Sequence, residues 1–80
     1  MQQTILRLEG NTTELEDAIA VCKEMEAGAV VLNFTTNQQL RSVASIRFND
    51  LTAMRQSQIT RHLIEKMAGK LCVEWKMPKE

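Results

Sequence analysis

Eighty residues, 44% of them hydrophobic and 25% charged, are typical of one small globular domain, residues 1–80. One proline and three glycines leave little room for linkers or disordered arms, and the formal net charge is zero. No apolar segment approaches the roughly 20 residues of a membrane helix, and no basic-then-apolar leader opens the chain. We therefore expect a soluble cytoplasmic domain with no membrane partner.

The first third of the chain predicts a strand followed by a helix. Residues 3–9 alternate apolar and polar side chains, with Ile5 as the exception, and Gly10-Asn11 is a turn signal. Thr13 and Glu16 then fit a capping box, and Gly28 fits a left-handed helix end. The helix between them carries an apolar stripe at helical spacing, made of Leu15, Ala18, Ile19, Cys22 and Met25.

The run Val30–Phe34 is the clearest strand signal, because it is β-branched and aromatic and too short for another helix. Since it is apolar on both faces, we expect a central strand that is covered on both sides, or on one side with a partner on the other. The polar residues 36–39 predict a loop. Residues 43–48 fit a strand with Ala44, Ile46 and Phe48 inward, and they also fit a helix face; the strand is favoured, which makes the loop a hairpin.

The last third predicts a second helix and a final strand. Asn49 or Asp50 is the expected cap, and Gly69 ends the helix. Leu51 and Met54 lie off the rest of the stripe, so either the helix changes partner near Arg55 or the main helix begins at Ser57. The expected buried stripe consists of Ile59, Leu63, Ile64 and Met67. Residues 71–77 alternate strictly, with Leu71, Val73, Trp75 and Met77 on one face.

These elements predict an α+β fold in the order β-α-β-β-α-β. A four-stranded sheet with two helices packed on one face, a ferredoxin-like sandwich, satisfies this order. The alternative is a mostly helical, winged-helix-like domain, which would follow if residues 43–48 were helical.

No pattern in the sequence indicates a catalytic, cofactor-binding or metal site, so we interpret the chain as a non-enzymatic domain. His62 is the only histidine and has no cysteine or acid at ligand spacing, and no glycine-rich phosphate loop is present. Cys22 and Cys72 are expected to be reduced and partly buried thiols, with a disulfide as the alternative.

The polar stretch Arg55–His62 is the most suggestive surface segment, because arginine and glutamine side chains contact phosphates and base edges. The phrase QSQITRHL, Gln56 to Leu63, resembles the recognition helix of winged-helix repressors. The chain departs from that family at Asn49, where a small residue is expected, and it lacks the glycine-bearing turn. The alternative function is a DNA-binding regulator that uses Arg55, Gln56, Gln58, Thr60 and Arg61, with Arg41 and Arg47 as phosphate contacts.

A protein–protein role is the leading hypothesis: a binding or regulatory module that forms a homo-oligomer. A chain of this size has a thin core, and at least one sheet face needs covering. Acidic side chains predominate in residues 1–35 and basic ones in residues 36–80, which favours association of complementary surfaces. Trp75 is expected to pack inward; exposed on a sheet face, it would be an interface anchor instead.

Overall fold

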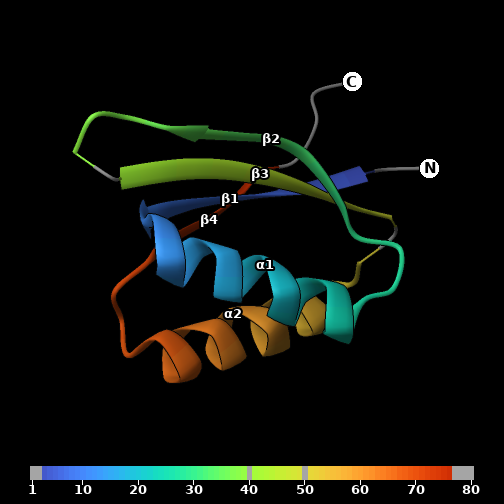
Figure 1. The fold of residues 1–80 in the computed structure, drawn as a ribbon. Helices are drawn as coiled ribbons and strands as arrows, with labels where there is room; N and C mark the ends of the chain where they lie inside the picture. The colour runs from blue at the N-terminus through green and yellow to red at the C-terminus, as the bar shows by residue number, and fades with distance from the viewer. Residues whose placement is uncertain (1–2, 40, 50, 77–80) are drawn as a thin grey trace.

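The computed structural model describes residues 3–39, 41–49 and 51–76. Both helices cover one face of an antiparallel four-stranded sheet (Figure 1). The order β-α-β-β-α-β confirms the predicted ferredoxin-like fold. The elements are β1 Gln3–Asn11, α1 Thr12–Met25, β2 Val30–Thr36, β3 Arg41–Asn49, α2 Ala53–Met67 and β4 Cys72–Lys76.

The ambiguous segment around residues 43–48 is a strand, so the helical, winged-helix-like alternative is wrong. β3 lies between β1 and β2 in the sheet and pairs with both. Its backbone N–H and C=O groups therefore form hydrogen bonds with two neighbouring strands, and a helix at this position would lose both pairings. Ala44, Ile46 and Phe48 point inward and are at most 1% exposed, as predicted.

β2 is an edge strand, so the expectation of a central position for Val30–Phe34 is wrong. The strand order is β2-β3-β1-β4, which places β3 and β1 in the middle. The hairpin after β2 folds β3 back into the position beside β1. An apolar run of β-branched residues is compatible with a central strand. It is equally compatible with an edge strand that pairs with a partner, so the composition of β2 does not distinguish the two positions.

The core lies between the helices and the sheet face that they cover. Its members are at most 1% exposed, and they come from β1, α1, β3 and α2: Leu6, Leu8, Leu15, Ala18, Cys22, Ala44, Ile46, Phe48, Ile59 and Leu63. Val21 joins the stripe of α1, whereas Ile19 and Met25 are only partly buried. Ile64 is 47% exposed, contrary to prediction, because it lies about 100° around the helix from Leu63.

α1 begins and ends at residues other than those predicted. Asn11 is its cap, since the side-chain Oδ1 accepts a hydrogen bond from the Thr13 amide at 3.0 Å. The helix ends at Met25, and the backbone of its C-cap residue, Glu26, is extended. Gly28 does not adopt a positive φ, so the left-handed glycine end is wrong at this position.

α2 is a single helix, which resolves the conflict seen in its sequence pattern. Thr52 caps it by accepting from the Arg55 amide at 3.1 Å, whereas Asn49 belongs to β3 and Asp50 lies outside the described residues. Ser57 is therefore inside the helix, Leu51 precedes it, and Met54 is 71% exposed. At the other end Gly69 adopts φ 72°, the left-handed conformation that was predicted, directly after Ala68 at φ 53°.

The alternation of β4 places its side chains, including the Cys72 thiol, on the two faces of the sheet. Val73 and Trp75 face the helices, and Met77 lies outside the described residues. Cys72 lies on the opposite sheet face, hereafter the open face, and is exposed rather than partly buried. Cys22 is buried in α1, and both cysteines are free thiols, as favoured from the sequence.

Gly10 lies where β1 passes closely over the start of β4 and leaves little room for a side chain. A Cβ at this position would overlap Cδ2 of Leu71 and lie 3.3 Å from the Lys70 carbonyl oxygen. We expect Gly10→Ala to lower the free energy of unfolding by about 1–3 kcal/mol, measured by urea denaturation. Gly28→Ala is the matched control, because its Cβ would have no atom within 4 Å and its φ is not positive; it should leave stability unchanged or raise it slightly. Equal losses in the two variants would contradict this role for Gly10.

Candidate functional site

Three of the five exposed large hydrophobic residues of the described chain lie on β2. Val30 is 42% exposed, Leu32 46% and Phe34 37%. The strand VVLNFTT contains no charged residue and no proline. Charged side chains and proline are two common ways of protecting an unpaired strand edge, and β2 has neither, although a bulge at Leu32 interrupts its register.

A bulge at Leu32 presents the apolar side chains of β2 on both faces of the sheet. Before the bulge Val30 pairs with Arg47, which lies on the open face. After it Phe34 pairs with the inward-facing Ala44. A partner strand along this edge would therefore meet apolar side chains above and below its backbone.

β4, the strand at the opposite edge of the sheet, is shorter than β2 and carries charged side chains. It is five residues long and carries Glu74 and Lys76, which form an ion pair at 3.7 Å on the open face. A short, charged edge is one of the ways in which proteins prevent edge-to-edge pairing. The contrast indicates that β2, and not β4, is the edge suited to a partner.

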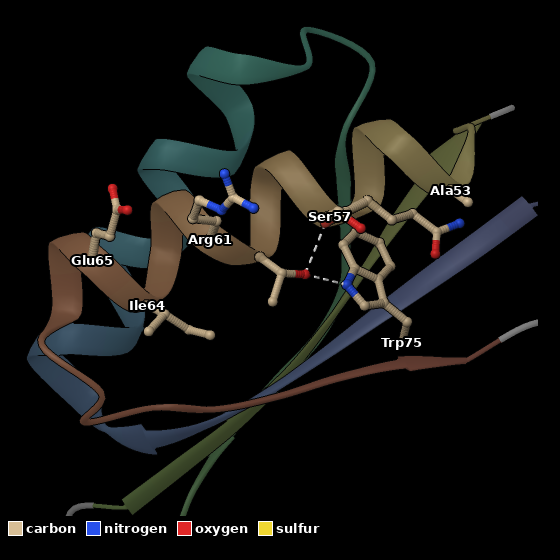
Figure 2. A pocket seen from close by; sticks show the side chains of 8 residues that line it. Ala53, Ser57, Arg61, Ile64, Glu65 and Trp75 are labelled. Carbon is tan, nitrogen blue, oxygen red and sulfur yellow. Dashed lines mark hydrogen bonds between the residues drawn. The ribbon is translucent and has the colours of Figure 1, made fainter.

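A pocket of about 620 Å³ lies along α2 beside β4 (Figure 2). Successive turns of the helix, from Ala53 to Glu65, form one wall, and the indole ring of Trp75 forms the other side. Ser57, Arg61 and Glu65 are spaced four residues apart and follow one row along the helix. That spacing was visible in the sequence, but nothing in it showed that the row borders a cavity.

Trp75 is held in a fixed orientation at this pocket. Its Nε1–H donates to Oγ1 of Thr60 at 2.6 Å, and the Thr60 hydroxyl donates to the Gln56 carbonyl oxygen at 2.8 Å. The ring also packs against Phe48, with centroids 5.6 Å apart. Trp75 is partly buried toward the helices, as predicted, and is not exposed on the open face.

The residues predicted to contact nucleic acid do not form one surface. Arg41 and Arg47 alternate with the inward residues of β3 and therefore lie on the open face, whereas α2 lies on the other side of the sheet. The helix preceding a recognition helix is also absent, because β3 occupies that part of the described chain. Gln56, Thr60 and Arg61 border the pocket, and Gln58 is exposed beside Arg55. A nucleic-acid role for these side chains stays a prediction.

Arg55 links the two helices. Its guanidinium donates to the Glu26 carboxylate, to the Met25 carbonyl oxygen at 3.0 Å and to Oε1 of Gln58 at 3.1 Å. The arginine side chain is only 33% exposed and that of Glu26 only 31%. The N–H groups of the Arg55 guanidinium are therefore largely bonded to other residues of the domain.

Removing this link should destabilise the domain. We expect Arg55→Ala to lower the free energy of unfolding by about 1–2 kcal/mol, because three hydrogen bonds to partly solvated groups are lost. Arg61→Ala is the matched control on the same helix, since Arg61 is exposed and has no ion pair among the described residues. Urea denaturation of both variants gives the comparison, and a control as unstable as Arg55→Ala would contradict the specific role of the link.

Within the described ranges no group of three or more histidine, cysteine, aspartate or glutamate side chains is arranged to hold a metal ion. His62 is exposed on α2. Neither helix in those ranges combines the length and the hydropathy needed to cross a membrane.

No protein-family model matches the chain, and no curated protein matches it. Among solved structures, the fold is similar to that of a formyltetrahydrofolate deformylase from Pseudomonas putida KT2440, with a TM-score of 0.65 and 15% sequence identity. The match covers 95% of this chain and 29% of the deformylase chain. At this identity the likeness shows the fold alone, and this chain spans under a third of the deformylase.

Proposed function

We propose that this domain is a binding or regulatory module that acts through protein–protein contact and self-associates through β2. Two copies would join their β2 strands antiparallel about a two-fold axis, extending both sheets into one. The observation that carries the proposal is the exposed, uncharged β2 edge with Val30, Leu32 and Phe34 at 37–46% exposure.

Pairing of the edges would satisfy two needs at once. The outward backbone groups of β2 would gain hydrogen-bond partners, and its apolar side chains would leave water on both sides of the new strand pair. A seven-residue strand is roughly 23 Å long, and a contact of this length buries less than the roughly 800 Å² per partner of a standard interface. We therefore expect a weak and reversible dimer.

The structural comparison gives general support to a modular role. In the deformylase the same fold corresponds to only 29% of the chain, so this fold occurs there as one part of a larger protein. A small domain of this kind suits association with a second copy or with another chain. No observation favours a catalytic function over this role.

Sedimentation velocity over a range of concentrations tests the proposal. The natural chain should show a concentration-dependent increase in mass, whereas Leu32→Lys should remain a monomer, because a charge at the edge would be desolvated on pairing. Met54→Lys is the matched control: it places the same charge on an exposed apolar residue of α2, away from the edge, and should associate like the natural chain.

Two results would overturn the proposal. One is a natural chain that remains monomeric at millimolar concentration. The other is an equal loss of association in Leu32→Lys and Met54→Lys, which would place the contact elsewhere or reveal a general effect of charge. Circular dichroism of each variant establishes that the fold is retained.

A further inference from the structure

We propose that the pocket along α2 is a binding site for a small aromatic carboxylate. The aromatic ring of the ligand would lie against Trp75, and its carboxylate would lie between the Ser57 hydroxyl and the Arg61 guanidinium. The pocket has a volume of about 620 Å³, which falls within the range of roughly 300–1,000 Å³ that is typical of ligand sites. This site is separate from the proposed self-association surface, since β4 and β2 are opposite edges of the sheet.

The orientation of Trp75 favours an aromatic group over a hydrogen-bonding one. The only N–H of the indole is already donated to Thr60, and Phe48 supports the ring from the core. The ring therefore offers the pocket apolar and π surface, which stacks or packs edge-on with another aromatic ring. Because Trp75 is already held in place, little side-chain entropy remains to be lost when a ligand binds.

Charge on the helix wall favours an anion at the Ser57 end. Arg61 is the basic residue of the lining, and within the described part of the chain it forms no ion pair or side-chain hydrogen bond. Its guanidinium fork suits a carboxylate, and the Ser57 hydroxyl one turn earlier adds a donor. Glu65 is the acidic residue of the lining. It lies one turn beyond Arg61, on the side away from Ser57, and two turns or roughly 12 Å along the helix axis from Ser57 itself.

The chain provides its own reporter of binding. Trp75 is the single tryptophan, so a proton–nitrogen correlation spectrum contains one indole signal, from the N–H bound to Thr60. Titration with naphthalene-2-carboxylate should move that signal along a saturable curve. The neutral naphthalene-2-methanol, which keeps the ring and lacks the charge, should bind about tenfold more weakly.

Arg61→Gln tests the assigned anion contact. It should weaken binding of the carboxylate about tenfold and leave binding of the alcohol unchanged. Arg41→Gln is the matched control, because Arg41 is also exposed but lies on β3, on the open face. Repeating the titration with Leu32→Lys separates the two proposals, since this variant should bind the carboxylate whether or not the natural chain self-associates.

The proposal fails on any of three results. The first is an indole signal that does not move, or moves without saturating, at millimolar naphthalene-2-carboxylate. The second is equal affinity for the carboxylate and the alcohol. The third is an Arg61→Gln variant that binds the carboxylate as tightly as Arg41→Gln.

Discussion

Phe48→Ala is expected to remove a large share, about a third or more, of the free energy of unfolding of this domain. Phe48 is 1% exposed, lies on the inward face of β3 and packs against Trp75. Truncating a buried phenylalanine costs about 3–5 kcal/mol, because apolar contacts are lost and a cavity remains. A domain of 80 residues has only about 4–12 kcal/mol of stability at typical values per residue.

The measurement is urea denaturation followed by circular dichroism, with Phe34→Ala as the matched control. Phe34 is the other phenylalanine, and it is 37% exposed on the edge strand, so its truncation should cost under about 1 kcal/mol at low protein concentration. A difference of less than 1 kcal/mol between the two variants would contradict the position of Phe48 in the core.

Cys22 should make the domain less stable in alkaline solution. Burial raises the pKa of its thiol from 9.0 to about 12. Below pH 9 the thiol is protonated in both the folded and the unfolded state. As the pH rises from 9 toward 12, the unfolded state loses this proton while the folded state keeps it, so the free energy of unfolding falls by about 1.4 kcal/mol per pH unit and by about 4 kcal/mol in total.

Urea denaturation of the natural chain, Cys22→Ala and Cys72→Ala between pH 7 and pH 10.5 isolates this contribution. Cys22→Ala is expected to be less stable at neutral pH, because a buried side chain is shortened, but its stability should fall less steeply above pH 9. Cys72→Ala should follow the natural chain, since Cys72 is exposed. Equal slopes in the two variants would show that the Cys22 thiol ionises alike in the folded and unfolded states.

Two edges of one sheet thus differ in the partners that they suit. β2 is uncharged along its full length and presents apolar side chains on both faces. Beside β4, Trp75 and the row of side chains on α2 form a pocket whose basic residue, Arg61, has no ion pair among the residues that the structure describes. The fold places these surfaces at opposite ends of the strand order, so a protein partner and a small ligand would not compete for space.

The sequence by itself determined the order of the elements and most of the residues that face inward. Leu6, Leu8, Ile46 and Leu63 are buried where a period of two or of about 3.6 residues places them, because periodicity follows from the local geometry of strands and helices. The strand at residues 43–48 was less certain, since six residues fit both periods. Pairing with β1 and β2, which depends on residues distant in the sequence, settled it.

Only the tertiary structure decided the strand order, the helix caps and the surroundings of α2. The position of Val30–Thr36 in the sheet depends on which strand of the β2–β3 hairpin pairs with β1. The residues of β2 themselves do not indicate this. Asn11, the last residue of β1, caps α1, whereas Thr52, three residues after the end of β3, caps α2. Ser57 and Arg61 border a pocket because Trp75, which is more than a dozen residues later in the chain, packs beneath the same helix.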